Sequence, residues 1–152
     1  MRHQHLVVAA LFLASSCGGS PSAPTAQPLS VTGSWTGTST DSQGVTVISL
    51  QLTQTGTTVS GTVSTRAPDP ADGSCNACHR NKTGTFTGTL TGTKLAMTMA
   101  FAAGVDGDPT PICSATMTGA APNVTASTLI GEFTGSDTCE GPFLDGKLTL
   151  RR

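Results

Sequence analysis

The sequence KLAMTMAF, from Lys94 to Phe101, carries its four large apolar side chains at every second residue. These are Leu95, Met97, Met99 and Phe101. Successive side chains of a β-strand point to opposite faces of the sheet, so this spacing predicts a strand with one buried and one exposed face. The turn sequence Thr91-Gly92-Thr93 directly precedes it. The stretch therefore predicts one strand of a sheet that covers a core.

The same two-residue period recurs from Val31 to the C-terminus, between turns that contain glycine. It predicts eight strands, at 32–40, 45–54, 57–65, 82–90, 94–101, 112–119, 127–135 and 143–151. Consecutive strands with short connections pair antiparallel. Eight such strands with one apolar face each predict an all-β, antiparallel up-and-down β-barrel over residues 32–152. A two-sheet β-sandwich fits the same pattern and is the alternative.

The first 16 residues have the features of a secretory signal peptide. Arg2 is followed by the short apolar run LVVAALFLA, from Leu6 to Ala14, which is well below the roughly 20 residues of a spanning helix. The segment ends ASSC, from Ala14 to Cys17. This resembles the lipobox of bacterial lipoproteins, in which the cysteine becomes the lipidated first residue. The alternative is an ordinary signal peptide with an unrelated cysteine.

The lipobox resemblance implies an exported protein that is anchored in a membrane through lipidated Cys17. Residues 17–31 contain GGSPSAPTAQPLS and predict a flexible tether between that cysteine and the barrel. Acyl chains on one cysteine hold firmly, since each buried CH₂ contributes about 0.8 kcal/mol. Gly18 after the cysteine resembles lipoproteins of the outer membrane, which applies if the source is a diderm bacterium.

Gly33-Ser34-Trp35 in the first predicted strand resembles the Gly-x-Trp signature of lipocalins and related calycin barrels. The segments LQLTQTGTTVSGTV (50–63) and FLDGKLTLRR (143–152) resemble uncharacterised bacterial lipoproteins with lipocalin- or avidin-like barrels. The resemblance implies that a basic side chain from the C-terminal end covers the tryptophan. Arg152 shares the parity of Leu148 and Leu150, so we expect it over Trp35, in a cation–π contact of about 1 kcal/mol. The resemblance implies no ligand. Because Trp35 is the only tryptophan, biotin binding is not supported.

Four cysteines follow Cys17, and an even number in an exported protein favours disulfides. An antiparallel arrangement brings the start of the sixth predicted strand near the end of the seventh. We therefore favour a bond between Cys113 and Cys139 over the other pairings. Cys75 and Cys78, in the predicted loop 66–81, would then pair with each other, although that ring is small.

Cys75-Asn76-Ala77-Cys78-His79 has the C-x-x-C-H spacing of c-type haem attachment. Against this reading, the loop is polar and no helical period surrounds it. A second axial ligand would have to be a methionine, and Met97, Met99 and Met117 are all predicted to lie in the core. A zinc site with these three residues lacks a fourth ligand at a recognisable spacing. Disulfide chemistry is therefore the favoured interpretation of Cys75 and Cys78, and we expect no cofactor and no metal.

Composition restricts the remaining function classes. Charged residues make up 11% of the chain, with a formal net charge of -1, so no basic patch is present for nucleic acid. After signal removal His79 is the only histidine, and Glu132 and Glu140 are the only glutamates. Glu132 has the outward parity of its strand, and Asp106-Gly107-Asp108 is better explained as a solvated turn than as a cation site. These residues do not predict an enzyme.

Two functional hypotheses follow. The first is a membrane-anchored lipoprotein whose small barrel is a binding or structural module of the cell envelope, with a small apolar ligand or an envelope component as partner. The second is an exported electron carrier with haem c attached at Cys75, Cys78 and His79.

Overall fold

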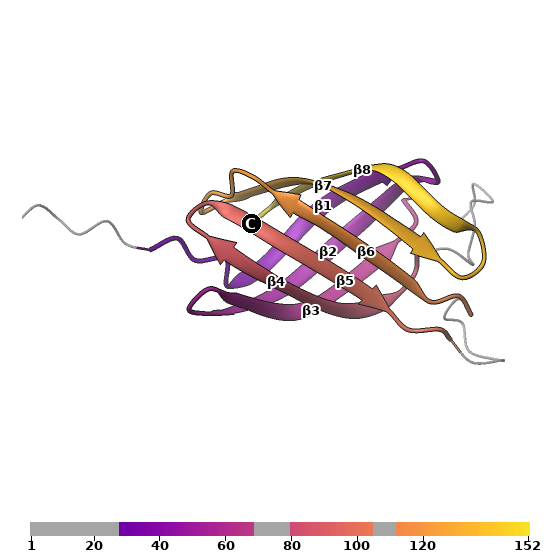
Figure 1. The fold of residues 1–152 in the computed structure, drawn as a ribbon, viewed down its shortest axis with the longest axis horizontal. Helices are drawn as coiled ribbons and strands as arrows, with labels where there is room; N and C mark the ends of the chain where they lie inside the picture. The colour runs from indigo at the N-terminus through magenta and orange to yellow at the C-terminus, as the bar shows by residue number, and fades with distance from the viewer. Residues whose placement is uncertain (1–27, 69–79, 105–111) are drawn as a thin grey trace, which may run out of the picture.

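The structure is a computed structural model and describes residues 28–68, 80–104 and 112–152. In this part of the chain the strands form one closed, antiparallel, up-and-down barrel (Figure 1). The predicted fold class is therefore confirmed, and the sandwich alternative is wrong. The strands are β1 (Gly33–Asp41), β2 (Gly44–Thr55), β3 (Thr58–Arg66), β4 (Thr83–Thr91), β5 (Lys94–Phe101), β6 (Ala115–Ala121), β7 (Thr128–Asp137) and β8 (Gly141–Arg151). The described residues include no helix that could cross a bilayer.

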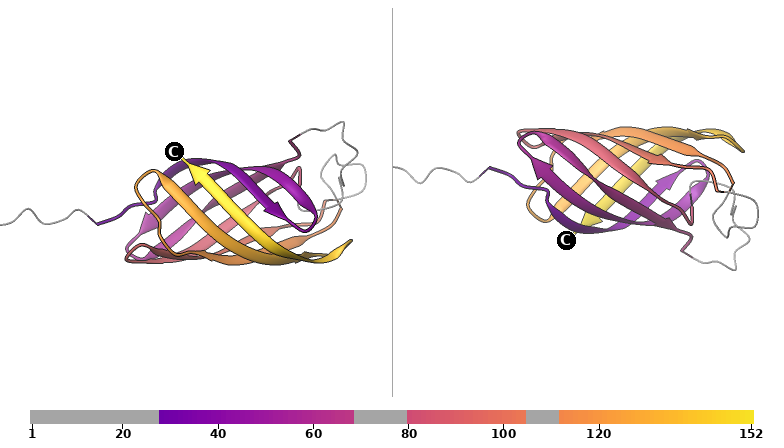
Figure 2. Two further views of the ribbon diagram at one scale, coloured as in Figure 1. Left: turned by 90° about the horizontal axis from the view of Figure 1, so that it is seen from above. Right: turned by 90° about the horizontal axis from the view of Figure 1, so that it is seen from below.

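Each strand pairs with the next one in the chain, and the pairing of β1 with β8 closes the barrel. Full closure leaves no strand edge exposed for pairing with another chain. The ladder between β7 and β8 contains one register shift, between Phe133 and Gly135. The architecture is compatible with a lipocalin-like barrel. Figure 2 shows that the first described residues and the C-terminus lie at the same end of the barrel.

The side chains that point inward fill the barrel with one apolar core. In β5 the four alternating residues of KLAMTMAF are all at most 3% exposed, as their period predicts. The largest fully buried side chains are Trp35, Phe86, Phe143, Ile48, Leu50, Leu95, Met99, Met117, Leu129, Leu148 and Leu150. They come from seven of the strands and from both halves of the chain, so the core cannot form before distant strands have met.

Glycines at inward positions let neighbouring strands approach closely. A Cβ at Gly61 of β3 would overlap the backbone carbonyl oxygen of Gln51 on β2. A Cβ at Gly37 of β1 would likewise overlap the carbonyl oxygen of Thr149 on β8. These contacts explain the recurring x-Gly-Thr units, because a strongly curved strand in a narrow barrel has no room for a side chain at these points.

The observed strand bounds differ from the predicted ones by at most three residues, and those of β5 agree. The largest difference is in β6, which begins at Ala115 and not at Ile112, so that Cys113 precedes the strand. The reason lies in the neighbouring strand. Phe101 is the last residue of β5 and pairs with Ala115, so residues before Ala115 have no partner on β5. At its other end β6 continues to Ala121, which pairs with Leu95.

Candidate functional site

The two ends of the barrel differ in chemistry. We call the end that carries Leu29, Val31 and Arg152 the tether end, because the chain from residue 28 enters the barrel there (Figure 1). The opposite end carries the β1–β2 and β7–β8 turns, and we call it the polar end. Buried polar and charged side chains gather there, whereas the apolar core fills the barrel between the two ends.

At the tether end, Trp35 closes the core. Its side chain is fully buried, and its indole Nε1 donates a hydrogen bond of 2.8 Å to the carbonyl oxygen of Val31. The guanidinium carbon of Arg152 lies 4.8 Å from the centroid of the Trp35 ring. This is the contact that we expected from the Gly-x-Trp resemblance and the parity of β8.

Arg152 also holds the incoming chain against the barrel. Its guanidinium donates hydrogen bonds to the carbonyl oxygens of Thr32 (2.6 Å) and Ser30 (2.9 Å), and also to that of Ala126. On the other side of the segment, the Gln54 side chain accepts a bond of 2.9 Å from the Val31 backbone N–H. The segment that follows the tether is thus fixed to both β2 and the C-terminus. The sequence predicts the stacking of Arg152 but not these backbone contacts.

The polar end was not predicted from the sequence. Its inward side chains include three hydroxyl groups, two cations and two carboxylates. Those that are at most 4% exposed are Ser39, Thr46, Thr65, Arg80, Lys82 and Asp137. Asp41 and Gln43, in and beside the β1–β2 turn, are half-buried. Burial of charge is costly unless the charge is paired and hydrogen-bonded, so this end has the composition of a site and not of a core.

The two cations of the polar end are held by backbone carbonyl groups. Arg80 donates from Nη2 to the carbonyl oxygen of Gln43 (2.6 Å), so it reaches across to the β1–β2 turn. Lys82 donates from Nζ to the carbonyl oxygen of Ala102, just after β5 (3.1 Å). Burial lowers the pKa of Lys82 below its usual value, and the negative charge of Asp137 opposes this effect.

Several buried polar atoms of this end have no hydrogen-bond partner. They include Ser39 Oγ, Gln43 Oε1, Thr46 Oγ1, Arg80 Nε and Asp137 Oδ2. The great majority of buried polar groups in folded proteins are paired, and each exception needs an explanation. A group of such atoms at one end of a barrel indicates a place for a molecule that is not part of the chain.

A disulfide closes one side of the polar end. Cys113 and Cys139 are bonded, with their Cα atoms 5.6 Å apart, which confirms the favoured pairing. The bond joins the segment before β6 to the β7–β8 turn. Oδ1 of Asp137 accepts hydrogen bonds from the backbone N–H groups of Cys139 (2.9 Å) and Glu140 (2.6 Å). Asp137 therefore orders this turn with one oxygen while its other oxygen stays without a partner.

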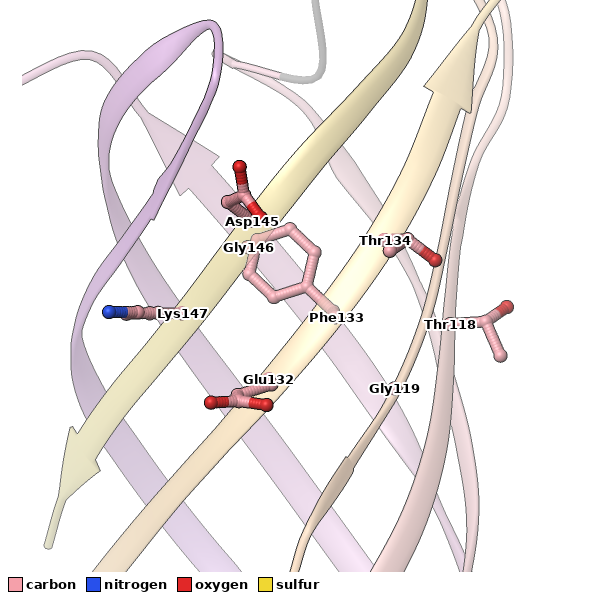
Figure 3. Close-up of a pocket in the computed structure, with 8 residues that line it drawn as sticks. All are labelled: Thr118, Gly119, Glu132, Phe133, Thr134, Asp145, Gly146 and Lys147. Carbon is pink, nitrogen blue, oxygen red and sulfur yellow. The ribbon is translucent and has the colours of Figure 1, made fainter.

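The outer wall has a separate hollow of about 470 Å³ between β6, β7 and β8 (Figure 3). It lies over Gly119 and Gly146, next to the ring of Phe133. Glu132 and Lys147, partners in the β7–β8 register, line its edge and are exposed. Glu132 points outward, as its parity predicts. Among the described residues, no group of three or more potential ligands could hold a metal ion.

Several residues singled out in the sequence lie outside the described part of the chain. These are Cys17, Cys75, Cys78, His79, Asp106 and Asp108. Lipidation of Cys17, pairing of Cys75 with Cys78 and haem attachment therefore stay predictions. Comparison of the chain with protein-family models and with curated proteins found no match.

Proposed function

We propose that this protein is an exported lipoprotein of the cell envelope, anchored through Cys17, whose barrel is a rigid scaffold that presents the polar end to a binding partner. The observation that carries the proposal is the difference between the two ends of the barrel. The chain from the predicted anchor enters at the tether end, and the buried charged groups lie at the opposite end.

The packed core supports a structural role for the barrel more than a ligand-binding cavity inside it. An eight-stranded barrel encloses enough room for side chains or for one small ligand. Here Trp35, Phe86 and Phe143, with the other inward residues, occupy that room and are at most 4% exposed. An apolar ligand inside the barrel would have to displace these side chains, and overpacking a filled core typically costs about 1–3 kcal/mol. Binding at an end of the barrel would leave this apolar core in place.

The predicted tether, and the contacts that hold residues 30–32 against the barrel, favour an orientation with the polar end away from the membrane. From Cys17 to Leu29 the chain has 12 peptide steps, and a flexible linker of that length would span roughly 20 Å on average. Leu29 packs on the core, and Arg152 holds the carbonyl oxygens of Ser30 and Thr32. A lipidated Cys17 would therefore keep the tether end next to the bilayer and leave the polar end open to the envelope space.

The haem alternative finds less support. It needs a second axial ligand, and the methionines Met97, Met99 and Met117 are at most 3% exposed within the core. The bond between Cys113 and Cys139 leaves Cys75 and Cys78 as the natural partners of each other. We therefore do not adopt it as the proposed function.

Mass spectrometry of the protein exported from a bacterial host tests the anchor. We expect a mature chain that begins at Cys17, carries acyl groups and sediments with the membrane fraction. The Cys17→Ser variant is expected to lose the acyl mass and to appear in the soluble fraction. A mature terminus elsewhere, or a Cys17 without acyl groups, would contradict the proposal. The same spectra report whether residues 75–79 carry a haem mass.

A further inference from the structure

We propose that the polar end binds a neutral, polyhydroxylated ligand, a saccharide, through Ser39, Thr46, Arg80 and Asp137. The inference rests on the proposed function in that it names the ligand class of the end that the scaffold presents. The site itself does not depend on the anchor, because all four residues belong to the barrel or flank it.

The site contains buried groups that the chain itself does not satisfy. Ser39, Thr46, Arg80 and Asp137 are all at most 4% exposed, and each has a polar atom without a partner. Leaving a buried donor or acceptor without a partner costs the folded protein its full desolvation penalty. A sequence retains such groups at one place most readily when another molecule completes their hydrogen bonds.

Three of the four groups come from one side of the barrel. Ser39 and Thr46 are direct partners in the β1–β2 ladder, and both point inward. Arg80 reaches the same hairpin, where it donates to the carbonyl oxygen of Gln43. Their unpaired Oγ, Oγ1 and Nε–H therefore line the β1–β2 side of the polar end.

Asp137 lies on β7, which is separated from β2 by β8 and β1 in the closed sheet. Asp137 is buried beside the β7–β8 turn, whose N–H groups it accepts from, and its charge acts on Lys82, so the carboxylate belongs to the same polar end. A ligand held between these two sides would meet donors on one and a carboxylate oxygen on the other.

The balance of charge decides the ligand class. Among the described residues, the buried or half-buried charged side chains of the polar end are the cations Arg80 and Lys82 and the carboxylates Asp41 and Asp137. An anion would be buried beside the two carboxylates, and a cation beside the two positive side chains; either would add an uncompensated charge. A neutral ligand adds none.

The unpaired atoms are also of both kinds. Arg80 Nε–H can only donate, Asp137 Oδ2 and Gln43 Oε1 accept, and the hydroxyls of Ser39 and Thr46 do either. Sugar hydroxyl groups donate and accept at the same atom, so one saccharide can satisfy all of these positions. Ordered water has the same capacity and is the competing explanation.

The test uses the full-length exported protein, ¹⁵N-labelled and purified in a detergent without a sugar headgroup. It is titrated with glucose, N-acetylglucosamine and the N-acetylglucosamine disaccharide, and separately with sodium acetate and sodium phosphate. We expect at least one of the neutral sugars to shift the backbone amide signals of residues 39, 46 and 80. The acetate and phosphate titrations are expected to leave these signals unchanged.

Thr46→Val separates a ligand role from a structural one. It keeps the shape of the side chain and removes the unpaired hydroxyl, so the ligand-free variant is expected to unfold at the same temperature as the parent or higher. Its sugar affinity is expected to fall by roughly fivefold to tenfold, the effect of one neutral hydrogen bond. Thr53→Val makes the same change at an exposed position of β2 and is expected to leave both measurements unchanged.

Three results would overturn the inference. If none of the sugars shifts these signals, water and not a saccharide occupies the polar end. If acetate or phosphate shifts them instead, the ligand class is wrong. If Thr46→Val lowers the unfolding temperature and leaves sugar affinity intact, the hydroxyl is structural. None of these results bears on acylation of Cys17, so failure of this inference is distinguishable from failure of the proposed anchor.

Discussion

Removal of the bond between Cys113 and Cys139 should weaken the barrel by several kcal/mol. The two cysteines are 26 residues apart in sequence, so the bond closes a loop that contains β6 and β7. Loop-closure entropy for a ring of this length corresponds to about 3.5 kcal/mol at 25 °C. For a chain of this size, such a loss lowers the unfolding midpoint by about 10 °C.

The loss should be felt most strongly at the polar end. The bond joins the segment before β6 to the β7–β8 turn, where the Thr138 backbone N–H also donates to the Ser114 carbonyl oxygen. Without the bond, the turn is held by this contact, by the hydrogen bond from the Ser114 backbone N–H to Thr138 Oγ1 (3.1 Å), and by the two hydrogen bonds accepted by Asp137. Amide hydrogen exchange in the turn should therefore accelerate more than exchange in β2 or β3, which are on the other side of the barrel.

The assay is urea denaturation of the Cys113→Ala/Cys139→Ala variant beside its parent. Both proteins carry Cys75→Ser and Cys78→Ser, so that no other pair of cysteines in the barrel domain responds to reductant. Reduction of the parent should reproduce the loss seen in the variant, and reductant should leave the variant itself unchanged. A loss below about 1 kcal/mol, or a variant that still responds to reductant, would refute the entropic reasoning.

Two further predictions concern the barrel wall and the buried lysine. Gly61→Ala should destabilise the protein by about 1–3 kcal/mol, because its Cβ would overlap the carbonyl oxygen of Gln51. Chemical denaturation measures this loss. The control is Thr62→Ala, at the neighbouring exposed position, which should change the stability little. Burial lowers the pKa of Lys82, so between that lowered pKa and 10.5 the unfolded chain binds more protons than the folded one, and stability should rise with pH across this window. The measurement is chemical denaturation of the parent and of Lys82→Met at several alkaline pH values. The prediction is wrong if the unfolding free energy of both proteins has the same slope against pH, or if the parent loses stability as Lys82 becomes neutral beside Asp137.

The fold could be predicted from the sequence because its signals are local and repeated. In β5 the period of two in KLAMTMAF fixes both the strand type and the buried face, and the bounds 94–101 agree with the structure. Strand ends were less predictable, since they depend on where a neighbour stops. Ile112 to Ser114 follow the strand pattern, yet β5 ends at Phe101 and offers them no partner.

The polar end could not be predicted because the position of a residue in a strand indicates which face its side chain points to, but not how deeply that side chain is buried. Ser39, Thr46 and Lys82 have the inward parity of their strands, but a polar residue near a strand end usually lies in solvent. Their burial depends on the closure of the barrel, which brings residues from β1, β2 and β7 to one end although almost 100 positions separate Ser39 from Asp137. Asp137 was hidden further by the predicted end of its strand at Gly135, two residues before the carboxylate that orders the β7–β8 turn. In a closed barrel, polar residues of inward parity near the strand ends are therefore the positions to inspect first for a site, even when the sequence between them contains no motif.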